Sequence, residues 1–287
     1  MKNRELKNKR HKSEMPPGKA LRWVITWFIL AMGFSWVVRH YFSTQLQVEF
    51  LTCYAVEWSL SLDNLFVFLM IFEAFGVDTH RQIRVLWWGI AGAMVLRMVF
   101  IFLGVALVQM FEPILYVFGA FLIYSAYMMA FSKEGTKDVK NNVLVRLVRR
   151  RFSVTKNFHG DAFFIRRMGI TFATPMLLVL VAIESSDVMF AVDSIPAAFA
   201  ITRNPFIIYS ANIFAILGLR SLYFLLAQAD RMFRFLKYGI SFILAFVGFK
   251  MLAAHHIEFN EYISLGIILI SIVGSILLSV FVKNENG

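Results

Sequence analysis

The feature that most limits how this chain can fold is a series of long, mostly apolar stretches. A hydrocarbon core about 30 Å thick is crossed by roughly 20 apolar residues in a helix. By that measure the sequence predicts about eight transmembrane helices, at 21–42, 50–77, 83–110, 113–131, 169–200, 205–228, 236–254 and 262–282. Because 59% of the 287 residues are hydrophobic and only 16% are charged, one soluble core could not bury them. We therefore expect an all-α polytopic membrane protein, embedded in the lipid bilayer.

Several other classes of protein are disfavoured by the same sequence. Cys53 is the one cysteine, so the chain can form neither an internal disulfide nor a thiolate metal cluster. No G-x-x-x-x-G-K-[ST] motif is present, which excludes an ATP site of the P-loop type. We expect no enzymatic activity and no bound organic cofactor. The net charge of +11 could suggest nucleic acid, but the basic residues lie where they set membrane topology, so no nucleic-acid partner is expected.

Most lysines and arginines fall on one side of the predicted spans. They gather in the tail 1–20 and in the loop 132–168, and the positive-inside rule places both segments and both termini in the cytoplasm. The expected location is the inner (plasma) membrane of a bacterium, and attraction to anionic lipids is a by-product. The predicted segments are a basic tail 1–20, a first helix 21–42, a three-helix repeat 50–131, a basic loop 132–168, a second repeat 169–254 and a last helix 262–282.

The two predicted repeats carry the same polar residues in the same order. The shared pattern is an acid, a polar pair beginning with aspartate six residues later, and an arginine in the next span. The first half has Glu57, Asp63, Asn64 and Arg97, and the second has Asp187, Asp193, Ser194 and Arg220. Because each half has three spans, an odd number, the second half must enter the membrane upside down. Such inverted repeats are typical of secondary transporters, whose substrate sites lie near the midplane.

Five carboxylates lie inside the apolar stretches: Glu57, Asp63, Glu184, Asp187 and Asp193. An isolated charge at the centre of a spanning helix costs about 2.5–3.5 kcal/mol, so five charges require partners. On a straight helix Asp63 and Asp193 are displaced by about 100° from the faces that carry the other acids. Proline residues in the fifth span predict a kink or unwound segment that could turn Asp193 inward.

Carboxylates, an amide and hydroxyls are hard oxygen donors, which suit Mn²⁺, Mg²⁺ or Ca²⁺. A blander interpretation is that Arg97 and Arg220 pair with the acids merely to hold helices together. An intramembrane aspartyl protease would also need paired aspartates, but its G-x-G-D context is absent. His255 and His256, between the last two spans on the outer side, could receive an exiting metal or belong to a solvated loop.

Long motifs then point to a known family. The segment ATPMLLVLVAIESSDVMFAVDSIPAAFAITRNPFIIYSANIFAILGLRSLYFLLA, with EWSLSLDNLFVFLMIF and VLRMVFIFLG, resembles the TerC family of membrane proteins, close to its pH-responsive Alx branch. The resemblance implies a manganese-linked transporter, associated with Mn²⁺ export, alkaline-pH response and tellurium (tellurite) resistance. By motif position it implies metal ligands at Glu57, Asp63, Asn64, Glu184, Asp187, Asp193 and Ser194. Trp58, Met128 and Asn204 depart from residues common in the family, outside the acidic core.

The expected function is therefore Mn²⁺ export by alternating access. Ionised carboxylates would take Mn²⁺ as transported substrate from the cytoplasm, and their protonation would release it outside, giving proton antiport. Arg97 and Arg220 would balance the charge of the acids when the metal is absent. Two alternatives stay open: a non-transporting membrane scaffold or assembly factor for envelope stress or tellurite resistance, and a transporter of another cation such as Ca²⁺.

Overall fold

The structure is a computed structural model. It describes residues 17–131, 143–167, 169–226, 235–254, 257 and 259–281, and it describes the backbone alone at 17, 63, 220, 226, 280 and 281. The side chains of Asp63 and Arg220 and the residues His255 and His256 therefore lie outside the described part of the chain.

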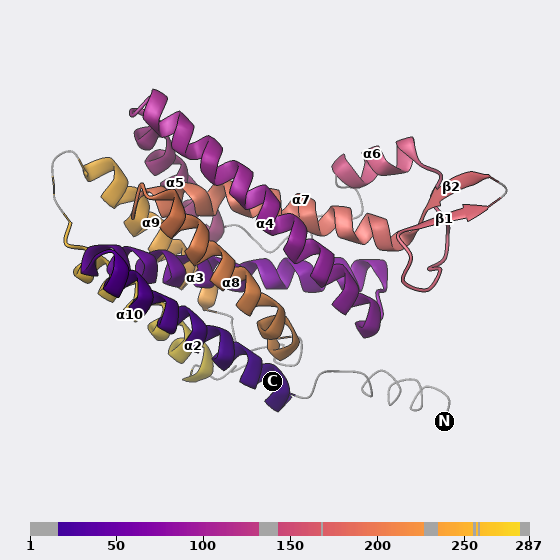
Figure 1. The fold of residues 1–287 in the computed structure, drawn as a ribbon, viewed down its shortest axis with the longest axis horizontal. Helices are drawn as coiled ribbons and strands as arrows, with labels where there is room; N and C mark the ends of the chain where they lie inside the picture. Colours follow the sequence, from indigo (N-terminus) through magenta and orange to yellow (C-terminus); the bar gives the residue numbers. More distant parts are fainter. Residues whose placement is uncertain are drawn as a thin grey trace.

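The expected spanning helices are confirmed (Figure 1): within the described residues, eight helices are long and apolar enough to cross a membrane. They are α2 (Pro17–Tyr41), α3 (Thr44–Phe75), α4 (Thr79–Met110), α5 (Ile114–Phe131), α7 (Pro175–Phe199), α8 (Pro205–Leu226), α9 (Leu236–Ala253) and α10 (Glu261–Phe281). Large apolar side chains such as Trp36, Phe102 and Ile270 are exposed along these helices, as expected where lipid is the solvent.

Two predicted boundaries are wrong. The second span begins at Thr44 rather than at residue 50. The fifth span begins at Pro175 rather than at residue 169, because β1 (Phe164–Arg167) and β2 (Ile170–Ala173) form an antiparallel hairpin immediately before it. Gly169 supports the turn with a positive φ of 79°. The helix then starts with Pro at its first position and Thr174 as N-cap, whose hydroxyl accepts a hydrogen bond from Met176 N at 3.2 Å.

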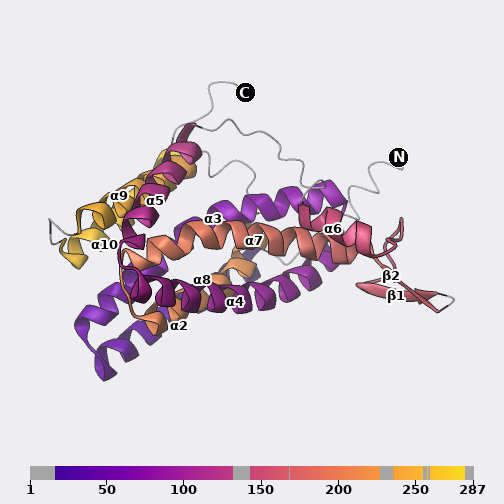
Figure 2. The ribbon, with the colours of Figure 1, turned by 90° about the horizontal axis from the view of Figure 1, so that it is seen from above.

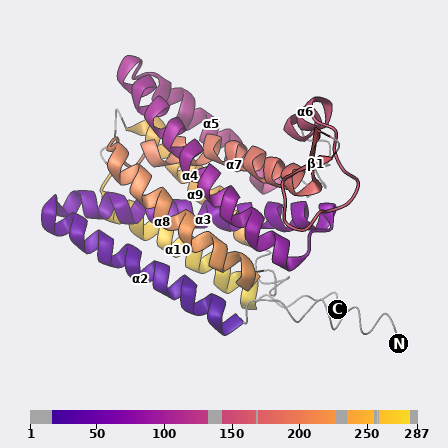
Figure 3. The same ribbon diagram turned by 45° about the vertical axis from the view of Figure 1, so that its right-hand side comes forward.

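The predicted basic loop also holds a short helix, α6 (Val143–Arg151), whose Val145 is fully buried. Together α6 and the hairpin form a small unit at one end of the bundle (Figure 3). We call residues 143–174 the end unit.

The helices of the two predicted repeats pack against one another. Helix α3 contacts α7, α4 contacts α8, and α5 packs along α9. Helix α2 covers α8 and α3, while α10 contacts α9 and α3. Figure 2 shows α5, α9 and α10 inclined away from the bundle formed by α3, α4, α7 and α8. Helix α3 also contacts α8, and α4 also contacts α7, so the contacts are not limited to corresponding helices. The inverted repeats stay a prediction.

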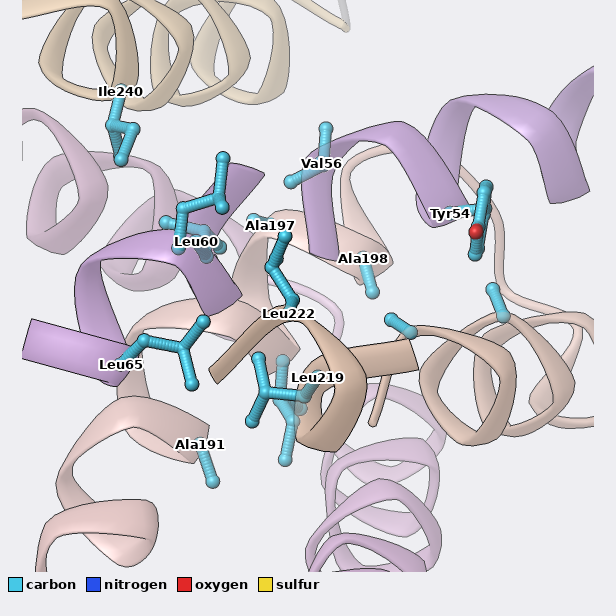
Figure 4. Close-up of a cluster of buried hydrophobic side chains, with 14 of the residues drawn as sticks. Tyr54, Val56, Leu60, Leu65, Ala191, Ala197, Ala198, Leu219, Leu222 and Ile240 are labelled. Atoms are coloured by element: carbon cyan, nitrogen blue, oxygen red, sulfur yellow. The ribbon is translucent and has the colours of Figure 1, made fainter. Parts of the chain in front are cut away.

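Apolar side chains fill the space between the central helices. Figure 4 shows this cluster, which draws on α3, α7, α8 and α9; the labelled members include Val56, Leu60, Ala191, Leu219 and Ile240. All of them are buried. Charged groups placed among these helices are consequently shielded from water, and their interactions are strong.

Candidate functional site

Arg97 is the centre of a polar cluster at the meeting point of four helices. This side chain, on α4, is only 2% exposed. Its Nη1 donates to Glu57 Oε2 on α3 at 2.6 Å and also to Asn212 Oδ1 on α8. Its Nη2 lies 3.4 Å from Asp187 Oδ1 on α7. The structure thus brings together three of the predicted site residues, Arg97, Glu57 and Asp187.

Asn212 completes the coordination of Glu57. Its Nδ2 donates to Glu57 Oε1 at 2.7 Å, so each oxygen of that carboxylate has a partner. Sequence analysis missed Asn212, which is a neutral residue in the middle of an apolar span. The available signal was its position on the predicted arginine-bearing helix, eight residues before Arg220. We call Glu57, Arg97, Asp187 and Asn212 the arginine cluster.

The arginine cluster is not fully satisfied. One guanidinium lies between two carboxylates, so the cluster carries an excess negative charge when both acids are ionised. Asp187 Oδ2 and Arg97 Nε are buried without a hydrogen-bond partner within the described residues. A buried carboxylate oxygen that lacks a partner is costly. This oxygen is therefore suited to receiving a proton or a cation.

Glu184 lies one turn before Asp187 on α7 and is half-buried. Its Oε2 is likewise buried with no partner among the side chains that the structure describes. Gly92 of α4 faces this carboxylate, and a Cβ added to Gly92 would overlap the Glu184 oxygens. Gly92, which sequence analysis also missed, thus provides the space in which Glu184 lies between α4 and α7.

Asp193 and Ser194 occupy a different region of α7. Asp193 Oδ1 accepts a hydrogen bond from Ser125 Oγ of α5 at 2.8 Å. Ser194 is buried, and its Oγ has no partner in the described part of the chain. The proposed unwinding of this segment is not seen, because α7 continues through Pro196 to Phe199. Asn64 is buried on α3, one residue after Asp63.

The six predicted ligands whose side chains the structure describes therefore do not form a closed cage in this conformation. Across the described residues, no group of three or more His, Cys, Asp and Glu side chains is close enough to hold a metal ion. The side chain of Asp63 is outside that search. Between Glu57 and Asp187 the position of a cation is taken by the guanidinium of Arg97.

A second, partly buried ion pair joins α9 to α10. Lys250 Nζ lies 2.7 Å and 2.9 Å from the two carboxylate oxygens of Glu261. Lys250 is only 7% exposed. This pair links the last helix to the predicted second repeat, and it is separate from the arginine cluster.

Comparisons with known proteins agree with this architecture. Residues 42–287 match the model of the integral membrane protein TerC family. A "putative membrane-bound redox modulator Alx" of Salmonella typhi is 41% identical over 288 aligned positions, covering 98% of this chain and 89% of the relative. The protein of the same name from Escherichia coli K12 is 40% identical over 286 positions, covering 97% and 89%. An uncharacterized membrane protein of Myxococcus xanthus is 41% identical over 269 positions, covering 94% and 84%. No solved structure matches the chain.

Proposed function

Since the chain belongs to the TerC family of integral membrane proteins, we propose that it is a transporter that exports a divalent metal ion, with Mn²⁺ as the leading substrate. The observation that carries this proposal is the buried guanidinium of Arg97 between the carboxylates of Glu57 and Asp187. These two acids hold the same position in the two predicted repeats. A site formed by both repeats is the arrangement that alternating access requires.

In this proposal Arg97 acts as a stand-in for the transported ion. In the conformation described here, the guanidinium holds the two acids. An arriving divalent cation displaces Arg97 and takes oxygen ligands from Glu57 and Asp187. The unpartnered oxygens of Asp187 and Glu184 are available as further ligands. Carboxylate ligands suit Mn²⁺, and they also suit Ca²⁺, which is the alternative cation.

Protons complete the cycle. Protonation of the same carboxylates on the outer side lowers their charge and releases the ion, so transport is coupled to proton entry without ATP. The topology that goes with this direction places both termini and the end unit in the cytoplasm of a bacterium, as the distribution of basic residues indicates. Rocking of one predicted repeat against the other switches the site between the two sides.

The experiment that tests this proposal measures manganese. Total cellular manganese is determined by elemental mass spectrometry in Mn-loaded cells that express the wild type, Glu57→Gln, Asp187→Asn or Glu112→Gln at equal membrane levels. Glu112 is the matched control, because its side chain is 69% exposed and forms a surface ion pair with Arg203. We expect lower manganese with the wild type and Glu112→Gln, and no lowering with the other two variants. Equal lowering by all four proteins would exclude transport through the arginine cluster.

Proteoliposomes then distinguish the substrates. Purified wild type is reconstituted with an internal metal-sensitive dye and a pH dye, and Mn²⁺ or Ca²⁺ is added outside. Mn²⁺ movement with opposite proton movement supports the proposed antiport. Movement of Ca²⁺ without movement of Mn²⁺ would identify Ca²⁺ as the substrate, and the proposed site would stay the same.

A second candidate function is a non-transporting scaffold for membrane-protein assembly. The end unit favours it, because α6 presents the exposed side chains of Arg146, Arg149 and Arg150. A scaffold predicts that proteins co-purifying with the wild type persist in Glu57→Gln and are lost when these arginines are neutralised. The transporter predicts instead that manganese export is lost in Glu57→Gln and persists when these arginines are neutralised.

A further inference from the structure

A cavity of about 540 Å³ lies at the end of the bundle where the end unit meets the spanning helices. Its lining comes from the last turn of α3, the first turn of α7 and the segment around the end of α6. The arginine cluster contributes no residue to this lining. The cavity is therefore a separate feature, which the proposed transport does not use.

The walls of this cavity are held by hydrogen bonds within the end unit. Ala173 N donates to Ser153 O at 3.0 Å, and Thr155 N donates to Ala173 O at 2.9 Å. From the far side, Arg81 Nε of α4 donates to Gly160 O at 3.1 Å. The segment that carries the polar wall is thus hydrogen-bonded both to the end of β2 and to α4.

The two sides of the cavity differ in chemistry. Phe75, Pro175 and Leu178 line it from the membrane helices, and they are apolar. The end unit contributes apolar side chains as well, from Phe152, Val154 and Phe158, but it alone supplies polar groups to the lining. Arg149 and Lys156 provide two positive charges, and Ser153 provides a hydroxyl. Neither Arg149 nor Lys156 forms an ion pair with any other residue that the structure describes.

The position of the cavity determines which ligand fits both sides. Phe75 ends α3 and Pro175 begins α7, so the cavity lies at a membrane–water boundary whichever way the protein is oriented. At that depth an anionic phospholipid presents a phosphate beside its acyl chains. Basic pockets between spanning helices at such a boundary bind lipid headgroups of this kind. A free phosphate would satisfy the basic side and leave the apolar side against water.

We propose that this cavity is a binding site for an anionic phospholipid, with the headgroup phosphate at Arg149 and Lys156 and an acyl chain along Phe75 and Leu178. Ser153 donates a hydrogen bond to a phosphate oxygen. Because the lipid contacts α3, α6 and α7 together, it ties the end unit to the two helices that carry Glu57 and Asp187.

Native mass spectrometry of the full-length protein, released from detergent with added phosphatidylglycerol, tests the proposal. The site variant is Arg149→Ala with Lys156→Ala. The matched control is Arg146→Ala with Arg150→Ala, which removes two exposed charges from α6 outside the cavity lining. We expect the site variant to weaken the first lipid-binding event on the order of tenfold, and the control to change it less than about twofold. Phosphatidylcholine is expected to bind the site variant, the control variant and the wild type equally weakly.

Two competitors identify the source of the phosphate. Inorganic phosphate and the deacylated headgroup, glycerophosphoglycerol, are added in millimolar excess over the lipid. Retention of bound phosphatidylglycerol supports a lipid site in which the acyl chain contributes. Displacement of the lipid by either competitor at this excess overturns the proposal in favour of a soluble phosphate ligand. Equal weakening by the site and control variants also overturns it, because the attraction would then be a property of net charge alone.

Discussion

The molecule contains two helix crossings of opposite character. Where α3, α4, α7 and α8 meet, buried charged and amide groups bind one another around Arg97. Where α5 crosses α9, two glycines bring the backbones together. A Cβ added to Gly248 would lie 2.8 Å from Gly119 O, and one added to Gly119 would lie 3.1 Å from Gly248 O.

The α5–α9 crossing shows what architecture alone requires in a membrane. Lipid is as apolar as a leucine side chain, so helices associate through close packing of small residues rather than through hydrophobic burial. Glycines achieve that close approach without any charge. The arginine cluster is more costly than such packing, because ionised groups must be taken out of water. Charges beyond what helix association needs are therefore best explained by function.

The predicted repeats also differ in one instructive way. Glu57 and Asp187 correspond to each other, yet both bind the arginine of the first repeat. Eight residues before its arginine the second repeat has Asn212, whereas the first has Gly89 at that spacing. Asn212 donates to Glu57, so the acids are matched while their donors are not. In the proposed transport cycle, this asymmetry means that the two halves need not have equal energies.

The largest effect is expected from Arg97→Met, which breaks the arginine cluster. Removing one partner of a buried ion pair typically costs about 3–5 kcal/mol, because the remaining charges are left uncompensated. Thermal unfolding in detergent should show a much lower midpoint for this variant. If the guanidinium stands in for a metal ion, Mn²⁺ should raise that midpoint more in Arg97→Met than in the wild type. An Mn²⁺ effect no larger than the wild type's would contradict the stand-in role.

The second effect concerns the glycine crossing. Gly248→Leu forces α5 and α9 apart, and overpacking of this kind costs about 1–3 kcal/mol. Gly266→Leu on α10 is the control, since a Cβ there meets nothing within 4 Å. Unfolding midpoints should fall for Gly248→Leu alone. Equal midpoints for both variants would show that the close approach contributes little to stability.

The third prediction concerns Gly92, which lies beside Glu184, and it tests manganese export separately from stability. Gly92→Ala places a methyl group where the Glu184 carboxylate lies, so that flexible side chain must move. We expect the free energy of unfolding to change by less than about 1.5 kcal/mol, because the group that must move is the flexible end of the Glu184 side chain. Manganese export should nevertheless fall severalfold in the cellular assay. Export at the wild-type level would remove Glu184 from the proposed ligand set.

The sequence was sufficient for the helices because a membrane imposes a simple length rule. Each span needs roughly 20 apolar residues, and that pattern is visible without knowing any contact. The start of α7 was placed too early for the same reason. Ile170–Ala173 is as apolar as a helix turn, and only Thr174 and Pro175 mark the true boundary.

The candidate site was predictable only in part. Glu57, Asp187 and Arg97 stand out because charges inside apolar spans are rare and expensive. Which arginine binds which acid depends on how α4 lies between α3 and α7, and spacing along one helix does not contain that information. The hydrogen bond from Ser125 to Asp193 depends in the same way on the packing of α5 against α7. Asn212 carries no charge, so placing it in an apolar span costs less free energy, and the sequence alone did not single it out.

The smallest effect is expected at an ion pair that shares the chemistry of the arginine cluster but not its burial. Arg203 Nη2 donates to Glu112 Oε1 at 2.8 Å, yet their side chains are 62% and 69% exposed. Exposed pairs of this kind contribute about 0–1 kcal/mol, since water and salt screen both charges. Arg203→Gln should therefore leave the unfolding midpoint and manganese export close to the wild type. Added salt should make Arg203→Gln and the wild type still more alike. It should not rescue Arg97→Met, because the acids that lose their partner there are buried away from screening ions. A large loss of stability or of manganese export in Arg203→Gln would show that ion pairs matter here whether or not they are buried. The contrast between the two crossings would then lose its physical basis.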